Sequence, residues 1–313
     1  MPTFYLLIGL PGSGKSTYIE NFEEDAVVVS SDAIREELYG SAEVQDNPAR
    51  VFQIAHERVI AALQEGQNAI LDATNLNAKK RANLLAKIDK QVKDPVNKVA
   101  IVIATSIKAC VERQVNRERK VPEEVIWRMA RQFQTPSDWE GWTEIRLVRT
   151  EVSYYDKLEH DLSYSNVPHY CKYHMETIRD HMLFAEALAA YKAKTWGYPT
   201  EEIEFIKKIA RYHDIGKIYT VEFVTKGETK VAHYYGHENV SAYLFLCDPI
   251  LQKTLATKEI LVGSYVINCH MRHYSEKNMD KFYSEKMGKY AEYLRILEEA
   301  DSAASFPDEK FES

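Results

Sequence analysis

The stretch GLPGSGKS at residues 9–16 has the residue types and the spacing of a P-loop. Small residues in such a loop allow backbone N–H groups to surround phosphate oxygens at the start of a helix. Lys15 would then reach the β- and γ-phosphates of a nucleotide, and the Ser16 hydroxyl would bind Mg²⁺. The alternative is a glycine turn without a ligand, which the strand–loop–helix setting disfavours. We expect ATP or another nucleoside triphosphate, with Mg²⁺, at a site formed by Gly9, Gly12, Ser13, Gly14, Lys15, Ser16 and Thr17.

A second group of residues lies in the second half of the chain, on helical patterns. His174 and His181, His213, His270 and Asp301 each fall on the apolar face of such a pattern. A buried polar side chain without a partner is costly, and a buried charge is more so. One such histidine alone would be interpreted as a hydrogen-bonded core residue. Four predicted helices that each direct a histidine or an aspartate inward are better explained by a bound metal ion.

Two further carboxylates of the first half follow apolar runs. Asp32 and Arg35, in SSDAIR, follow the second run, which places them at the carboxyl edge of a sheet, where open α/β folds bind substrates. Arg35 is three residues from Asp32 and shares its helical face. A carboxylate that accepts a hydroxyl proton, beside an arginine that holds phosphate, would form an acceptor site. Asp32 could instead merely cap the helix. Asp72 ends the third run and could hold the Mg²⁺ hydration shell or fix Lys15.

Several arginines of the first half could meet phosphate. Arg81 could face the nucleotide. In RQVNRERKVP (113–122), Arg113 and Arg117 are one helical turn apart, and Arg119 and Lys120 follow. A helical lid that closes arginines over the γ-phosphate needs this spacing, because phosphoryl transfer is catalysed mainly by positioning and charge neutralisation. The alternative is a solvated charged face.

The set GLPGSGKS, SSDAIR, DATNLN and RQVNRERKVP resembles the polynucleotide 5′-kinase domain of phage and bacterial end-healing enzymes, over roughly residues 1–150. For the phosphate donor, the resemblance implies that Lys15 and Ser16 bind the phosphates and Mg²⁺, and that Arg113 and Arg117 are the lid arginines.

For the phosphate acceptor, the same resemblance implies that Asp32 is the general base for a 5′-hydroxyl. It also implies that Arg35 contacts the phosphate of the acceptor's terminal nucleotide and that Asp72 supports the site.

The second group of residues resembles the HD superfamily of metal-dependent phosphohydrolases, an all-helical fold, over roughly residues 169–305. The resemblance implies one or two divalent transition metals or Mg²⁺. A bound divalent ion lowers the pKa of its water towards ~7 and so supplies a hydroxide that attacks phosphorus. The implied ligands of one ion are His181, His213, Asp214 and Asp301, and a second ion would be bound by Asp214, His237 and His270. The candidates for holding substrate phosphate are His174, Lys217, Arg272 and His273.

These residues must be positioned by two different kinds of structure. Continuous β-rich apolar runs predict strands buried in a parallel sheet, with amphipathic helices between them, at 4–10, 26–30, 68–74, 98–105 and 144–149. A doubly wound α/β domain follows from this alternation. From about residue 170 helical periodicity dominates, and an all-α domain is expected. We expect the boundaries to be 1–152 for the kinase domain, 153–168 for a polar linker and 169–313 for the HD domain.

The composition limits the functional classes. The chain has 313 residues, of which 45% are hydrophobic and 28% charged, as in an ordinary soluble protein of about two domains. A net charge of −7 argues against a protein that coats nucleic acid by bulk electrostatics. The four cysteines form no CxxC pair, the apolar start is a strand rather than a signal peptide, and no apolar run could span a membrane. We expect a cytoplasmic protein without a membrane partner. The oligomeric state does not follow from the sequence.

A kinase and a phosphatase acting on one small metabolite would form a futile cycle, whereas on a broken strand they act at different ends. Bifunctional proteins that pair such a kinase with an HD domain are what this chain resembles. The expected function is end healing of RNA and/or DNA, with phosphorylation of a 5′-hydroxyl and removal of a 3′-phosphate or 2′,3′-cyclic phosphate before a ligase acts. Two alternatives are a small-molecule or nucleoside kinase fused to an HD nucleotidase, and a regulatory sensor that binds nucleotide without turnover.

Overall fold

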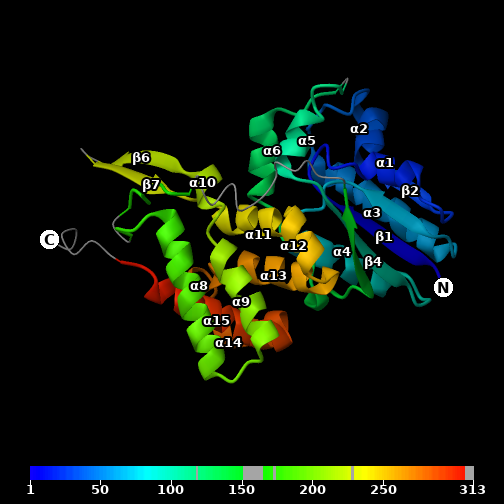
Figure 1. Cartoon of the computed structure of the whole chain (residues 1–313). Coiled ribbons are helices and arrows are strands. Elements are labelled where there is room, and N and C mark those ends of the chain that lie inside the picture. The colour runs from blue at the N-terminus through cyan, green and yellow to red at the C-terminus, as the bar shows by residue number, and fades with distance from the viewer. Residues whose placement is uncertain (118, 151–164, 172–173, 227–228, 307–313) are drawn as a thin grey trace. The chain divides into compact units, whose positions relative to one another are not determined.

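The structure is a computed structural model (Figure 1), and it describes residues 1–117, 119–150, 165–171, 174–226 and 229–306. The chain divides into two units. The first unit is Met1–Met129 with Pro136–Val152, and the second unit is Ala130–Thr135 with Ser153–Ser313. Most of the predicted linker, residues 153–164, lies outside the described residues.

A five-stranded sheet forms the centre of the first unit. Its order is β2-β3-β1-β4-β5 and every neighbouring pair is parallel, as predicted. Tyr5 and Leu7 of β1 lie in a buried cluster against which Tyr18 and Phe22 pack. Phe4, Leu6 and Ile8 alternate with them, point to the other face, and are also buried. The strands are β1 (Thr3–Ile8), β2 (Val27–Ser30), β3 (Ala69–Asp72), β4 (Asn97–Ala104) and β5 (Glu144–Arg149).

Helices separate the strands of the first unit, and several begin at a side chain that accepts a backbone N–H. Ser30, Asn47, Asn77 and Ser106 each cap a helix in this way. The helices are α1 (Lys15–Glu20), α2 (Ser31–Tyr39), α3 (Pro48–Gln64), α4 (Ala78–Gln91), α5 (Ile107–Glu112), α6 (Glu123–Ala130) and the short η1 (Asp138–Glu140).

The second unit is mainly helical, and α8 packs against α9 and α15 while α11 packs against α13. In Figure 1 these helices run from green through yellow and orange to red. The longer helices are α8 (Ile178–Thr195), α9 (Thr200–Tyr212), α11 (His237–Cys247), α13 (Thr257–Cys269) and α15 (Ala291–Ala303). The shorter ones are α10 (Lys217–Thr220), α12 (Pro249–Thr254), η2 (Arg272–Tyr274), α14 (Met279–Phe282), η3 (Tyr283–Met287) and η4 (Gly288–Tyr290).

Two local features differ from the expectation for this helical part. An antiparallel hairpin of β6 (Glu222–Lys226) and β7 (Thr229–His233) lies between α10 and α11. In addition, α8 begins only at Ile178, where Thr177 caps it. His174 therefore does not share a helix with His181, because the cap ends the helical periodicity before it.

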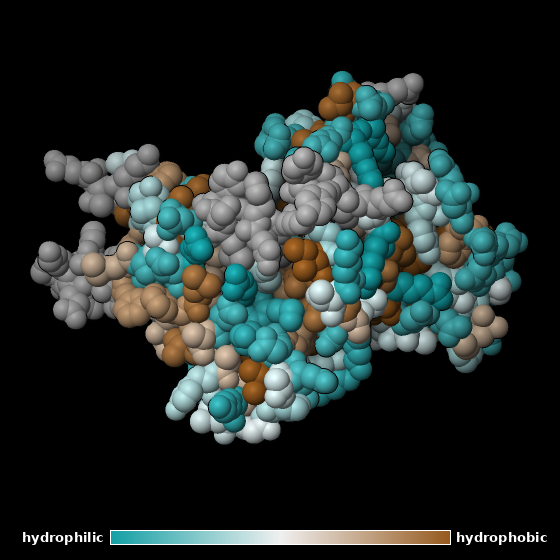
Figure 2. Space-filling model, in the orientation of Figure 1, coloured by the Kyte–Doolittle hydropathy of each residue, from teal (hydrophilic) through white to brown (hydrophobic). Residues whose placement is uncertain are grey.

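The surface shows hydrophobic residues in separate brown patches among hydrophilic ones in the view of Figure 2. Scattered exposed apolar residues are normal for globular proteins. Within the described ranges, no helix combines the length and the apolar character that crossing a membrane requires.

Candidate functional site

The order of the sheet brings the predicted residues of the first unit to one edge. Strands β2, β3 and β1 are neighbours and run in the same direction, so the segments that follow them meet at their carboxyl ends. Asp32 lies in the first turn of α2, directly after β2. Asp72 is the last residue of β3, and the P-loop follows β1.

The P-loop has the backbone geometry that requires glycine. Gly12 and Gly14 have φ values of 84° and 103°, in the left-handed region. A Cβ atom on Gly12 would also lie only 2.6 Å from the Cys110 carbonyl oxygen. The Lys15 ammonium folds onto the loop and donates to the carbonyl oxygens of Gly9 at 3.0 Å and Leu10 at 2.9 Å.

Lys15 and Asp72 influence each other electrostatically. Burial lowers the pKa of Lys15, and the charge of Asp72 opposes that shift. Burial raises the pKa of Asp72, and the charge of Lys15 opposes that shift in turn. The positive charge of Arg117 lowers both pKa values. Ser16 and Thr17 are exposed in the first turn of α1, which leaves their hydroxyls open to a ligand.

An arginine lies on each oxygen of the Asp32 carboxylate. Arg35 Nη1 is 2.8 Å from Asp32 Oδ1, and Arg119 Nη1 is 2.8 Å from Asp32 Oδ2. The Ser30 hydroxyl accepts the Asp32 N–H, so Ser30 rather than Asp32 caps α2. The Asp32 side chain is 54% exposed, and its carboxylate is therefore accessible as well as positioned.

The lid prediction fails in its helical geometry. Helix α5 ends at Glu112, and the described residues from Arg113 to α6 form turns, so no helix carries both predicted lid arginines. Arg113 still reaches the P-loop, since its Nη1 donates to the carbonyl oxygens of Gly12 and Ser13, each at 3.2 Å. Arg117 and Lys120 are exposed.

Arg81 does not face a nucleotide, contrary to the prediction. Its guanidinium is 1% exposed and forms a two-bond pair with the Glu140 carboxylate at 2.8 and 2.7 Å. Its third bond is to the Asn75 carbonyl oxygen at 2.9 Å. With these donors engaged, Arg81 joins α4 to η1 as a structural residue.

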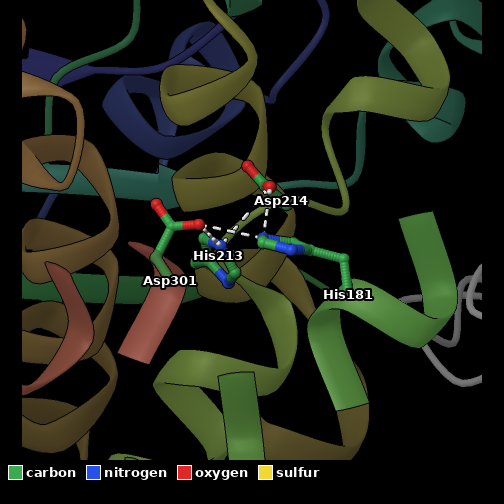
Figure 3. Close-up of side chains that lie close together, drawn as sticks. All are labelled: His181, His213, Asp214 and Asp301. Atoms are coloured by element: carbon green, nitrogen blue, oxygen red, sulfur yellow. Dashed lines mark hydrogen bonds and ion pairs between the residues drawn. The ribbon is translucent and has the colours of Figure 1, made fainter. Parts of the chain in front are cut away.

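In the second unit, four predicted residues from distant parts of the chain point toward one another (Figure 3). His181 lies on α8, His213 and Asp214 follow α9, and Asp301 lies on α15. His181 Nε2 is 2.9 Å from Asp301 Oδ1 and 3.3 Å from Asp214 Oδ2. His213 Nε2 is 3.3 Å from Asp301 Oδ1 and 3.4 Å from Asp214 Oδ2.

Asp214 also joins a second group through its other oxygen. His237 Nε2, at the start of α11, is 3.1 Å from Asp214 Oδ1, and His270 Nε2, after α13, is 3.5 Å from it. The two Nε2 atoms are 3.3 Å apart. Asp214 thus lies between the two groups, with Oδ2 toward the first and Oδ1 toward the second.

The histidines of both groups have acceptors on both sides of the ring. Nδ1 faces a backbone carbonyl oxygen in each case, of Ala210 for His213, Tyr234 for His237, Ile267 for His270 and Ala304 for His181. A neutral ring that carries its proton on Nδ1 has a lone pair on Nε2. For His181 and His213 this lone pair faces carboxylate oxygens, and for His237 and His270 the two lone pairs face each other. His213 Nε2 and Asp214 Oδ1 are buried without a hydrogen-bond partner. When these rings are neutral, the interior of the cluster needs positive charge, and divalent ions held by these ligands fit it.

Lys217 supplies one positive charge from the protein itself. Its Nζ is 2.7 Å from Asp214 Oδ2, and the side chain is 10% exposed. Burial would raise the pKa of Asp214, but the charges of Lys217 and His213 hold it well below its usual value. Burial would lower the pKa of His181, but its hydrogen bonds to Asp214, Asp301 and Glu176 raise it to about 11.

A third group beside the cluster includes two residues that the sequence reasoning missed. The rings of His169 and His174 stack at 4.0 Å, and Glu176 binds both, by its carbonyl oxygen to His169 Nδ1 at 3.0 Å and by Oε1 to His174 Nδ1 at 2.6 Å. The same Oε1 is 3.3 Å from His181 Nδ1. His169 and Glu176 precede α8, where no helical period marks a shared face, so only the local density of histidines in HYCKYHME could have indicated them.

We call the six residues His181, His213, Asp214, His237, His270 and Asp301 the cation cluster. No atom of Arg272 or His273 is part of it. His273 is exposed, and its Nδ1 lies 2.9 Å from the His270 carbonyl oxygen and 3.6 Å from Glu298 Oε1. Among the predicted phosphate-holding residues, Lys217 and His174 are the two that the structure places against the cluster.

Comparison with known proteins finds a separate family for each half of the chain. Residues 5–136 match the family model of the AAA domain, and residues 178–305 match that of the HD domain. The chain is similar to the L-seryl-tRNA(Sec) kinase of Methanococcus maripaludis, at 28% identity over 166 residues that cover 50% of this chain and 63% of that protein. This chain therefore spans less than two thirds of that relative's length.

Two solved structures are also similar to parts of the chain. One belongs to the Pnkp1/Rnl/Hen1 complex, with 26% identity, a TM-score of 0.30, and coverage of 38% of this chain and 43% of the other. Another is a gluconokinase from Sinorhizobium meliloti 1021, with 17% identity, a TM-score of 0.34, and coverage of 49% and 85%.

The predicted fold class is confirmed, since a parallel five-stranded sheet with a P-loop precedes a helical HD region. A P-loop of this kind implies a nucleotide with Mg²⁺, and an HD domain implies a divalent metal ion, for which the histidine and aspartate cluster offers the ligands. The chain therefore joins a part that matches the AAA domain and carries the P-loop to a part that matches the HD domain and carries the histidine and aspartate cluster.

Proposed function

We propose that the protein heals broken nucleic-acid ends, by transferring the γ-phosphate of a triphosphate to a 5′-hydroxyl and by hydrolysing a 3′-phosphate or 2′,3′-cyclic phosphate. The observation that carries the proposal is the Asp32 carboxylate with Arg35 and Arg119 on its two oxygens. A base that accepts the hydroxyl proton sits beside guanidinium groups suited to phosphate. A strand end brings a phosphodiester next to its 5′-hydroxyl, and a free nucleoside does not.

In the kinase half, each residue has a distinct part. Lys15 would leave the loop carbonyls for the β- and γ-phosphates, and the loop N–H groups of Gly12, Ser13 and Gly14 would hold them. Ser16 would hold Mg²⁺, which neutralises charge on the transferred group. Asp32 would accept the proton of the attacking hydroxyl. Arg113, already on the P-loop, would neutralise donor phosphate.

In the hydrolase half, His181, His213, Asp214 and Asp301 would hold one ion, and His237 and His270 would share Asp214 to hold another. Such ions supply hydroxide at neutral pH. The backbone carbonyls fix each ring with Nε2 inward, so the ligands are oriented before an ion binds. Lys217 and His174 would hold the substrate phosphate at the edge of the cluster.

The curated relative gives modest further support. Its name describes a kinase of L-seryl-tRNA(Sec). RNA and/or DNA ends are the proposed partners of this chain, with a ligase acting on the products.

The rival function is a nucleoside kinase fused to a nucleotidase. An oligonucleotide with a 5′-hydroxyl and a 3′-phosphate, incubated with labelled ATP and divalent ions beside a panel of free nucleosides, separates the two. End healing predicts label on the 5′ end and loss of the 3′-phosphate. Label confined to mononucleosides would establish the rival instead.

Replacing Glu176 with alanine should weaken binding of the first ion. Glu176 Oε1 accepts from His181 Nδ1 and so orients a proposed ligand without touching the ion. Although burial opposes it, hydrogen bonds from His181 and His174 lower the pKa of Glu176 to about 2, so its carboxylate is charged at neutral pH. Loss of such an outer partner typically costs about 10–100-fold in metal affinity. Titration calorimetry with Mn²⁺ measures the change.

Glu186→Gln is the matched control. Glu186 lies on α8 like His181, is also partly buried, and pairs with Arg211 at 2.8 Å, away from the cluster. Its replacement should leave ion binding unchanged. Equal ion affinity in Glu176→Ala and the wild type would contradict the orienting role.

Ion binding should release protons. Without ions, carboxylate pairing raises the pKa of His181 to about 11 and that of His213 to about 9, against burial, so both rings are protonated at pH 7. Below the unfolded histidine pKa near 6.5, the pairing contributes its full stabilisation to the ion-free fold. That stabilisation is lost as the pH rises through the pKa values of the two histidines in the folded protein. An ion must displace both protons, so its affinity should rise with pH.

Calorimetry in buffers with different ionisation enthalpies counts these protons. We expect about two protons released for the first ion at pH 7 and about one at pH 10, where His213 has lost its proton. An ion affinity that does not change between pH 7 and pH 10 would contradict this assignment.

A further inference from the structure

Residues 130–135 belong to the second unit although the residues on both sides of them belong to the first. They follow α6 and lie within the part of the chain that matches the AAA domain. Phe133 is 0% exposed and Thr135 is 1% exposed. Phe133 packs edge-to-face on Tyr243 of α11, with ring centroids 4.8 Å apart. This segment is therefore an integral part of the helical core.

Asn268 of α13 binds the segment with its whole carboxamide. Its Oδ1 accepts from the Thr135 backbone N–H and from the Thr135 hydroxyl, each at 2.7 Å. Its Nδ2 donates to the Phe133 carbonyl oxygen and to Asn239 Oδ1, each at 3.1 Å. Two acceptor sites and two donor hydrogens are thus all used, in a group that is 6% exposed.

Asn239 of α11 continues the network to the start of the segment. Its Nδ2 donates to the Arg131 carbonyl oxygen at 2.8 Å. The preceding turn places Gly236 so close that a Cβ there would lie 2.8 Å from the same carbonyl oxygen. Arg131 also forms an ion pair with Glu222.

The position of these asparagines relates the segment to the cation cluster. Asn239 is two residues after His237 in the first turn of α11, and Asn268 is two residues before His270 at the end of α13. The Thr135 hydroxyl is also 2.6 Å from that of Ser264, on the same helix as Asn268. The segment is thus bonded to both helices within one turn of the histidine pair.

The histidine pair needs such support, because its two Nε2 atoms are 3.3 Å apart and both Nδ1 atoms are bonded to carbonyl oxygens. Facing lone pairs repel each other when no cation lies between them. A satisfied, buried hydrogen-bond network is rigid, and it can hold two helix ends together against that repulsion.

We propose that residues 130–135, through Asn239 and Asn268, are the positioning element of the second cation subsite formed by His237, His270 and Asp214. This inference rests on the proposed hydrolase function. Its consequence is that residues inside the AAA-matching part of the chain complete the hydrolase site, so residues 169–313 alone lack part of its support.

The test uses the full chain with Thr135→Val, which keeps the side-chain shape and removes the hydroxyl that joins Asn268 to Ser264. Equilibrium dialysis with Mn²⁺ and elemental analysis measures both ions. We expect the second ion to bind about 10–100-fold more weakly, as for loss of an outer partner, with the first ion unchanged. Thr135→Ser keeps the hydroxyl and should bind the second ion with the affinity of the wild type.

Tyr265→Phe is the matched control, because it also removes a hydroxyl that α13 uses for hydrogen bonding, including the bond to the Lys286 carbonyl oxygen at 2.9 Å. It should lower the unfolding temperature without weakening either ion. Equal affinity for the second ion in Thr135→Val and Tyr265→Phe, or equal weakening of both ions in Thr135→Val, would overturn the positioning role.

The wild-type measurements separate this inference from the proposed function. If the wild type binds two ions but releases no 3′-phosphate, the proposed function fails and the subsite stands. If the wild type binds a single ion, the inference itself fails.

Discussion

Asp214→Ala is expected to abolish 3′-phosphate release while leaving 5′ phosphorylation at the wild-type rate. Asp214 lies between the two histidine groups, with Oδ2 toward His181 and His213 and Oδ1 toward His237 and His270. Its removal takes a ligand from both proposed ions at once. Loss of a residue that only supports a metal ligand typically lowers metal affinity or activity about 10–100-fold. Loss of a ligand shared by both ions should therefore lower phosphate release by more than about 100-fold. Release of phosphate from a 3′-phosphorylated oligonucleotide measures the loss.

The same substitution leaves Lys217 buried without its partner, and breaking a buried ion pair costs about 3–5 kcal/mol. Asp214→Asn, which keeps the side-chain volume, should therefore be made in parallel and checked for folding. Asp248→Ala is the control, because Asp248 is also buried but caps α12 away from the cluster. It should lose stability and keep phosphate release. Loss of kinase activity in a folded Asp214 variant would show that the two sites are not separate.

The second large effect concerns the kinase half. Lys15→Ala or Asp32→Ala should abolish 5′ phosphorylation and leave 3′-phosphate release intact. A positioned general base typically contributes about 10²–10⁴-fold, so Asp32→Ala should lose at least that factor. Lys15→Ala removes the ammonium that the P-loop carbonyls now hold for the nucleotide phosphates. Transfer of label from ATP to a 5′-hydroxyl oligonucleotide measures both.

Each variant has a counterpart elsewhere in the first unit. Glu37→Gln alters a carboxylate on the same helix as Asp32, paired with Arg58 at the surface. Lys98→Ala removes a lysine paired with Asp89 at 2.7 Å. Both should keep full activity. An Asp32→Ala protein that still phosphorylates 5′-hydroxyls at the wild-type rate would remove Asp32 from the role of general base.

The fold was predictable where one physical signal dominated. Strands buried on both faces of a parallel sheet appear as continuous apolar runs, as β1 and β4 do. All five runs became strands, although the edge strands β2 and β5 are more exposed. The lid segment 113–122 misled because the spacing of Arg113 and Arg117 suits a helix, whereas α5 ends at Glu112 and tertiary contacts hold the turn that follows.

The cation cluster was predictable because its helices keep a regular apolar face, and His181, His213 and Asp301 interrupt that face with polar atoms. Glu176 and His169 were missed because they precede the cap of α8 and follow no helical period, which leaves the local density of histidines as their only signal. The pairing of Arg81 with Glu140 joins residues 59 positions apart, and nothing in the local sequence marks it.

The most direct test of the account is whether divalent ions occupy the histidine and aspartate cluster and drive hydrolysis. The wild-type protein, stripped of ions and dialysed against Mg²⁺, Mn²⁺, Ni²⁺ or Zn²⁺, is analysed for bound ion and assayed for 3′-phosphate release at each step. We expect the wild type to bind ions that the Asp214→Asn variant does not bind. We also expect phosphate release by the wild type to stop when the ions are removed and to return when they are added back. Full phosphate release from a stripped protein that binds no ion at this cluster would contradict the account.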